Sequence, residues 1–144
     1  MAAQIITSRK VRLTPHEAIA ITHDLVRLAR LSPVVSRIEP VLGTKNEWKI
    51  TEDISILGLY KKTVHSTIRL EGAKANGADI SVSSALGVGL RSKWRVEADG
   101  EETCLITVED EVQAPFLVRW FVKQQAGAAR ATALQRMEEG QFSA

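Results

Sequence analysis

The sequence predicts an α+β fold in which a curved antiparallel β-sheet of six or seven strands wraps around one long C-terminal helix. Three observations carry this prediction. Apolar and polar residues alternate through most of the middle of the chain, as expected for half-buried antiparallel strands. Helical spacing of apolar residues appears once near the N-terminus. It returns over residues 115–139, which indicates that a long helix closes the chain.

The N-terminal region is expected to form a strand followed by two short helices. Residues 4–13 are rich in β-branched side chains and predict the strand. Thr14 is the expected N-cap of the first helix, with Pro15 at its first position and Glu17 at its third. The helical period continues to Pro33, which is far enough for two short helices separated by a bend.

The middle of the chain is expected to supply the remaining strands. Alternation and turn residues place them over residues 34–42, 46–56, 60–70, 78–86, 88–96 and 103–113. Asn76-Gly77 and Asp99-Gly100 are the strongest hairpin signals, because these residue types tolerate positive φ.

The final helix is expected to cover the apolar face of the sheet. At about 1.5 Å per residue, residues 115–139 are long enough to cross every strand. A sheet with one apolar face must bury it, and six or seven strands are wider than one helix, so the sheet has to curl around the helix. The space left between them is a natural ligand cavity.

Composition limits the classes of function. The chain has 144 residues, the size of one domain, so we expect a single domain over residues 1–144. Nineteen basic and 17 acidic residues give a net charge of +2 with the signs mixed, so no nucleic-acid partner is expected. Cys104 is the only cysteine, which excludes an internal disulfide and multi-cysteine metal sites. The three histidines lack metal-ligand spacing, and no cofactor is expected.

The chain shows no sign of membrane insertion or secretion. Its N-terminus lacks the apolar segment of a signal peptide, and no stretch approaches the roughly 18 apolar residues of a membrane span. We therefore expect a cytoplasmic protein without an integral membrane segment. A homodimer is compatible with the sequence.

Three short segments resemble a known superfamily. They are residues 14–17 (TPHE), residues 31–35 (LSPVV) and residues 38–42 (IEPVL), the last followed by Trp48. With the order of elements, they resemble the START and birch-pollen-allergen superfamily, also called SRPBCC, which includes polyketide cyclase-like proteins. The resemblance covers nearly the whole chain and rests on pattern. It implies a helix-grip fold and a cavity for a hydrophobic ligand, and it does not identify that ligand.

The wall of this predicted cavity is mostly apolar. The expected ligand-binding side chains are Trp48, Ile50, Ile54, Val64, Ile68, Leu90, Trp94, Ile106 and Val108 on the strands, and Phe116, Trp120 and Phe121 on the final helix. A filled core explains most of them without any ligand. The functional interpretation requires that some of them line an unfilled space.

Polar residues in phase with the apolar face are the candidate catalytic groups. Glu52 and Asp110 each lie between inward-facing apolar residues, and Ser66, Ser84 and Ser92 do likewise. A carboxylate in a cavity has a raised pKa, which suits acid–base chemistry, and Tyr60 is a third candidate. We favour the structural alternative, in which a bulge turns Glu52 outward or Asp110 lies at the open rim.

Three functions follow from these observations. The leading hypothesis is binding of a small hydrophobic molecule, such as a lipid, a sterol or a polyketide-like compound, between the sheet and the C-terminal helix. The second is a polyketide cyclase-type enzyme of secondary metabolism that uses the same cavity with Glu52, Asp110 or Tyr60 as proton-transfer groups. The third is a protein-interaction module that uses the outer face or an exposed edge strand.

Overall fold

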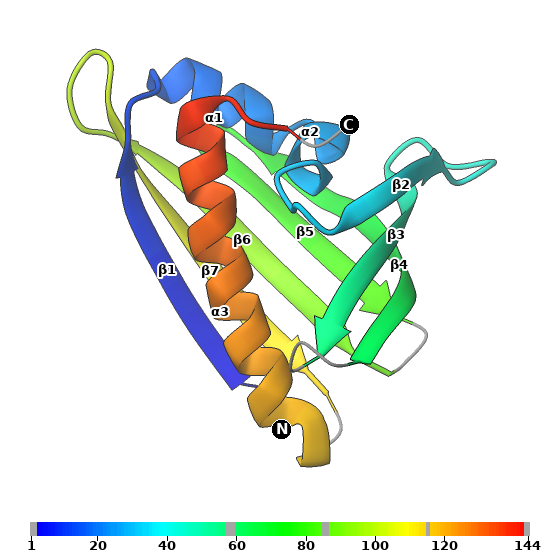
Figure 1. Ribbon diagram of the computed structural model, residues 1–144. Coiled ribbons are helices and arrows are strands. Elements are labelled where there is room, and N and C mark those ends of the chain that lie inside the picture. Colours follow the sequence, from blue (N-terminus) through cyan, green and yellow to red (C-terminus); the bar gives the residue numbers. More distant parts are fainter. Residues whose placement is uncertain (1–2, 57–59, 85–86, 115, 143–144) are drawn as a thin grey trace.

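The computed structural model describes residues 3–56, 60–84, 87–114 and 116–142, and within them it leaves the side chains of residues 3, 54–56, 60 and 116–125 undescribed. The described residues form seven strands and three helices (Figure 1). They are β1 (Ala3–Val11), α1 (Pro15–Thr22), α2 (Leu25–Ala29), β2 (Val35–Pro40), β3 (Glu47–Ile56), β4 (Tyr60–Lys74), β5 (Gly77–Ser84), β6 (Gly89–Ala98), β7 (Cys104–Gln113) and α3 (Phe116–Glu139).

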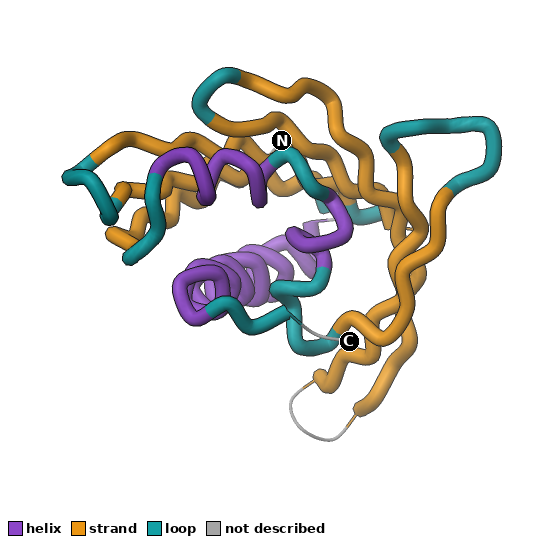
Figure 2. The backbone as a smooth tube through the Cα atoms, turned by 90° about the horizontal axis from the view of Figure 1, so that it is seen from above, coloured by secondary structure: helices purple, strands orange, loops and turns teal. Residues whose placement is uncertain are grey.

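The strands form one antiparallel sheet. Their order is β1-β7-β6-β5-β4-β3-β2, so each strand from β2 to β7 lies beside its neighbour in sequence and β1 pairs with β7. Seen from above, the sheet curves around α3 (Figure 2). The register shifts between Val35 and Arg37 and between Leu70 and Gly72, and such irregularities increase the local bend of a strand. The predicted helix-grip architecture is confirmed.

The two short helices close one end of the curved sheet. Thr14 caps α1 as expected, because its Oγ1 accepts a hydrogen bond from the backbone N–H of Glu17 at 3.1 Å. Asp24 caps α2 in the same way through the backbone N–H of Arg27. Helix α1 packs on β5 and β6, whereas α2 packs on β2, β3 and β4.

Helix α3 packs on β1 and β7. Ala133, Leu134 and Met137 share one helix face and are buried in the core. The Glu138 carboxylate accepts a hydrogen bond from the backbone N–H of Arg12 at 2.9 Å, which fixes the end of the helix beside β1. Among the described helices, none combines the length and the apolar character needed to cross a membrane.

The β4–β5 hairpin turns one residue earlier than the sequence predicts. Strand β4 runs to Lys74, Ala75 and Asn76 form the turn, and Gly77 is already the first residue of β5. Glycine is needed at this position for another reason. A Cβ on Gly77 would lie 1.8 Å from the backbone oxygen of Trp94 on β6.

Candidate functional site

A buried ion pair lies between the sheet and α3. Asp110 on β7 is 1% exposed. Arg130 of α3 donates from Nε to Asp110 Oδ2 at 2.9 Å and from Nη2 to Oδ1 at 3.1 Å. Ser92 Oγ donates to Oδ1 at 2.5 Å and accepts from Arg130 Nη2 at 2.9 Å. These three residues, here called the Arg130 cluster, satisfy both carboxylate oxygens of Asp110.

The fold brings the Arg130 cluster together from three elements. Ser92 on β6 and Asp110 on β7 are directly opposite each other in the antiparallel register, so both point to the inner face of the sheet. Arg130 lies one turn before Leu134 on the core-facing side of α3. Its guanidinium lies 5.3 Å from the centre of the Trp94 ring, at cation–π distance.

This position of Asp110 corrects the interpretation favoured from the sequence. Asp110 does not lie at an open rim, because its side chain is 0% exposed in the ion pair with Arg130. Sequence reasoning also missed Arg130. The available signal was its spacing from Leu134 on the helix expected to cover the sheet, since a buried carboxylate requires a cationic or hydrogen-bonding partner.

Glu52 on β3 faces the same interior. The bulge expected to turn it outward is absent from the β3–β4 pairing, whose register is continuous past Glu52 and Val64; the irregularity lies on β2 instead. Glu52 therefore stays in phase with buried Ile50, and its side chain is half-buried. Burial raises the pKa of the Glu52 carboxyl, and the positive charge of Arg130 partly opposes that rise.

The raised pKa of Glu52 predicts a pH-dependent effect of Glu52→Gln on stability. Between the ordinary and the raised pKa, the folded state binds more protons than the unfolded state, so stability falls as pH rises through this window. Glu52→Gln has no carboxyl at this position, so it lacks the free-energy cost of burying the ionised form. We expect its melting temperature to exceed that of the wild type above the raised pKa and the difference to disappear below the ordinary one.

Melting curves from about pH 4 to about pH 8 check this expectation. Glu97→Gln, at an exposed position on β6, controls for the loss of one carboxylate charge. Parallel pH profiles for wild type and Glu52→Gln would contradict the burial of this carboxyl.

The remaining predicted wall residues fall into three groups. Ile50, Ile68, Trp94, Ile106 and Val108 are buried in the core, whereas Trp48, Val64 and Leu90 are half-buried. The side chains of Ile54, Tyr60, Phe116, Trp120 and Phe121 lie outside the described residues. Val82, directly opposite Leu90, is also half-buried, so part of the inner apolar face remains accessible.

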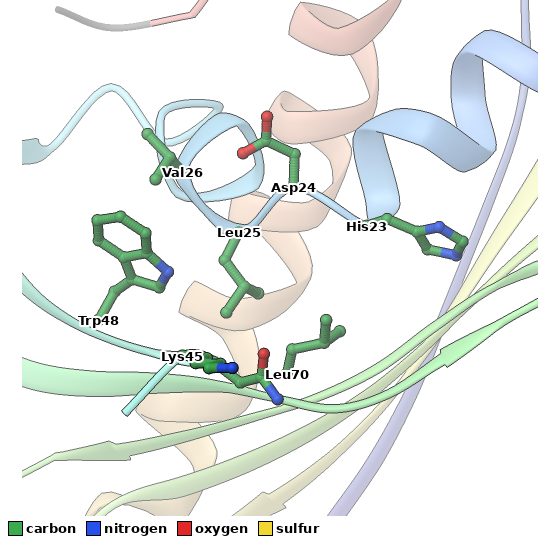
Figure 3. Close-up of a pocket in the computed structure, with 8 residues that line it drawn as sticks. His23, Asp24, Leu25, Val26, Lys45, Trp48 and Leu70 are labelled. Atoms are coloured by element: carbon green, nitrogen blue, oxygen red, sulfur yellow. The ribbon is translucent and has the colours of Figure 1, made fainter. Parts of the chain in front are cut away.

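A separate open pocket lies between α2 and strands β3 and β4 (Figure 3). Its volume is about 300 Å³. The residues that line it are His23, Asp24, Leu25, Val26, Lys45, Asn46, Trp48 and Leu70. Trp48 is the only predicted ligand-binding residue among them, and no member of the Arg130 cluster lines this pocket.

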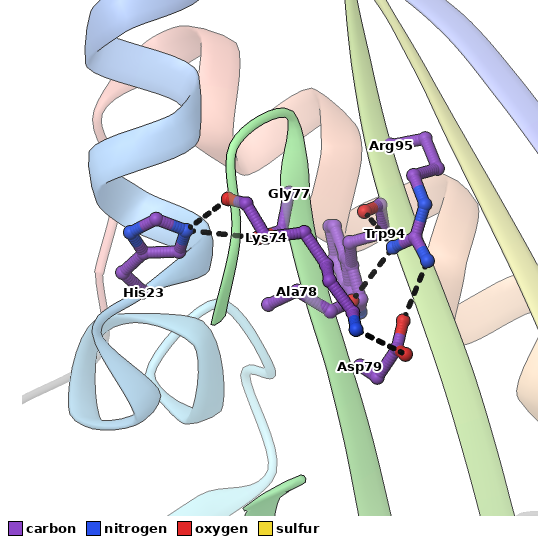
Figure 4. Close-up of polar contacts among 7 residues, drawn as sticks. All are labelled: His23, Lys74, Gly77, Ala78, Asp79, Trp94 and Arg95. Carbon is purple, nitrogen blue, oxygen red and sulfur yellow. Dashed lines mark hydrogen bonds and ion pairs between the residues drawn. The ribbon is translucent and has the colours of Figure 1, made fainter. Parts of the chain in front are cut away.

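Polar contacts fix the β4–β5 hairpin beside this pocket (Figure 4). Nε2 of His23 lies 2.9 Å from the backbone oxygen of Lys74 and 2.8 Å from that of Gly77, so Nε2 carries the hydrogen and donates to both. Arg95 donates to the backbone oxygen of Trp94 at 2.8 Å and to Asp79 at 2.7 Å. These bonds connect α1, the hairpin and β6.

Comparison with known proteins relates the chain to one family and one fold. Residues 5–141 match the model of a family described as "Domain of unknown function (DUF7053)". No curated protein sequence matches the chain.

Several solved structures share its fold. A conserved protein from Geobacillus kaustophilus is 12% identical with a TM-score of 0.80, and the match covers 96% of this chain and 94% of the other. A START superfamily protein from Mycobacterium smegmatis is 12% identical, with a TM-score of 0.71 and coverages of 95% and 97%. The Zhui aromatase/cyclase from a Streptomyces species is 12% identical, with a TM-score of 0.69 and coverages of 96% and 94%. The expected START-type fold is thereby confirmed.

Proposed function

Because the chain belongs to the DUF7053 family and has a START-type fold, we propose that it binds a small hydrophobic molecule between the inner face of the sheet and α3. A lipid, a sterol or a polyketide-like compound has the required chemistry. The observation that carries the proposal is the Arg130 cluster, buried on a mostly apolar face. Well-packed hydrophobic residues stabilise a core as well as or better than a buried ion pair, so stability alone gives little reason for this cluster.

The cluster and its surroundings offer both parts of an amphipathic binding site. Within the described part of the chain, Nη1 of Arg130 and the Glu52 carboxyl have no hydrogen-bond partner. They are available for a hydroxyl or carbonyl group of the ligand. The half-buried Val64, Val82 and Leu90 supply apolar surface for its body.

Filling the inner face is expected to abolish ligand binding. Val82→Trp places a large ring on that face, whereas Ser83→Trp adds the same ring at the adjacent exposed position of β5 and serves as the matched control. The measurements are native mass spectrometry of the purified protein and thermal shift with fatty acids, sterols and aromatic polyketides, because a ligand that prefers the folded state raises its stability. Circular dichroism establishes that each variant is folded, and Leu90→Trp replaces Val82→Trp if the latter is not.

Two results would refute the proposal. One is the absence of both a bound mass and a thermal shift across the panel. The other is equal binding by Val82→Trp and Ser83→Trp. The first result would favour the protein-interaction module.

A second candidate is cyclase-type acid–base chemistry in the same site, and Glu52 is the observation that favours it. A carboxyl with a raised pKa close to a guanidinium can exchange a proton with a carbonyl compound that Arg130 orients. Asp110 holds Arg130 with both oxygens and is the positioning residue in this scheme. The same mass spectra separate the two functions, because a carrier leaves its ligand unchanged and cyclisation with loss of water lowers the ligand's mass.

A further inference from the structure

We propose that the pocket between α2 and strands β3 and β4 is a second, independent binding site, which takes a small molecule with a flat apolar body and one carboxylate. This site shares no lining residue with the Arg130 cluster and does not depend on ligand binding at the inner face. Three features of the pocket carry the inference: the apolar side chains that flank it, the charge at its rim and the fixed backbone around it.

Apolar side chains flank the pocket on two sides, and the other residues that line it, His23, Asp24, Lys45 and Asn46, are polar. Leu25 and Val26 come from α2, and Trp48 and Leu70 come from the strands (Figure 3). Leu25 is buried, and the other three are half-buried, so part of their surface faces the open space. The volume of about 300 Å³ is at the small end of the range for ligand pockets. Beside an indole ring, this shape favours a compact, flat, apolar molecule.

The rim carries one positive charge that has no partner among the described residues. Asp24 is compensated, because its Oδ1 caps the backbone N–H of Arg27 and its Oδ2 accepts from Nε of the same residue at 3.1 Å. His23 uses its Nε2 hydrogen on two backbone oxygens. The Lys45 ammonium is exposed and has no ion pair or hydrogen bond within the described residues. An anion is therefore the group that the rim attracts.

The backbone that carries Lys45 is held in place. Its neighbour Asn46 accepts a hydrogen bond at its backbone oxygen from the N–H of Leu70 at 3.0 Å. At the tip of the β2–β3 hairpin, the backbone N–H and Oγ1 of Thr44 both donate to the backbone oxygen of Val41. Binding therefore requires little ordering of the chain, which lowers its entropic cost.

The test uses 2-naphthoate and its neutral analogue 2-naphthamide, with the indole N–H signals of the protein followed by NMR. Trp48→Phe identifies the Trp48 signal, which we expect 2-naphthoate to shift. Lys45→Ala should weaken 2-naphthoate about fivefold and leave 2-naphthamide unchanged, as expected for one exposed charge contact. Lys49→Ala, which removes the same charge from an exposed residue outside the pocket, should have no effect.

The same experiment separates this site from the one at the inner face. Val82→Trp, or Leu90→Trp in its place, fills that face and should leave the Trp48 shift intact, whereas a ligand beside the Arg130 cluster should shift the Trp94 signal. The inference is overturned if 2-naphthoate leaves the Trp48 signal unmoved or if 2-naphthamide binds as tightly. It is also overturned if Lys45→Ala and Lys49→Ala weaken binding equally.

Discussion

Replacing Arg130 by methionine is expected to lower the free energy of unfolding by about 3–5 kcal/mol, as typically follows when one partner of a buried ion pair is removed. Asp110 is the reason, because its side chain is 0% exposed and takes two hydrogen bonds from the guanidinium. Without Arg130, the Ser92 hydroxyl is the only hydrogen-bond partner of this carboxylate in the described part of the chain. Methionine keeps much of the apolar stem, so the loss reports mainly on the charge.

Urea denaturation of the wild type and the variant measures this loss, and two variants control it. Arg136→Met removes an arginine six residues further along α3, whose Nε donates to the backbone oxygen of Gln141, and it should cost less than about 1 kcal/mol. Adding Asp110→Leu to Arg130→Met should restore part of the stability, because no uncompensated charge remains. A loss below about 1 kcal/mol for Arg130→Met would show that water reaches Asp110.

The sequence was sufficient to predict the fold, because the information for each element is local. Alternation along residues 88–96 and 103–113 identified β6 and β7 and the faces they bury. The capping box at Thr14 and Glu17 located the start of α1 to the residue. Such patterns depend on neighbours within a few positions and survive without any knowledge of tertiary packing.

The state of Asp110 depends on information that is not local. Strand phase correctly predicted that Asp110 points inward. Its depth follows from the strand order, because β1 pairs with β7 and thereby places β7 inside the sheet, under α3. Arg130 lies in an alanine-rich helical segment, and its role depends on how α3 is rotated about its axis. Neither property is encoded within a few residues of the position concerned.

The position of Trp48 also depends on packing that the local sequence does not specify. Its alternation with Ile50 predicted an inner-face residue under the C-terminal helix. The structure places it at the edge of that face, in the pocket that α2 covers. The bend between α1 and α2 decides which helix covers which strands, and a hydrophobic period does not specify the angle of a bend.

Gly77→Ala is expected to be the second strongly destabilising change, at about 3 kcal/mol, the upper end of typical overpacking costs. The added Cβ would lie 1.8 Å from the backbone oxygen of Trp94 and 2.7 Å from its carbonyl carbon. Both are backbone atoms, so no side-chain rotation removes the clash. The strands must separate where Gly77 also accepts the hydrogen bond from His23. Because the Trp94 ring lies under the Arg130 guanidinium, the displacement is expected to reach the buried cluster.

Gly43→Ala is the matched control for this prediction. Gly43 has φ of +81° in the β2–β3 hairpin, and a Cβ there would meet no atom within 4 Å. Alanine at this position should cost only the backbone penalty of about 1–2 kcal/mol for a left-handed conformation. Urea denaturation of both variants separates steric overlap from backbone preference. Equal losses would mean that the approach of β5 to Trp94 is looser than 1.8 Å implies, and β6 would then not constrain the β4–β5 hairpin.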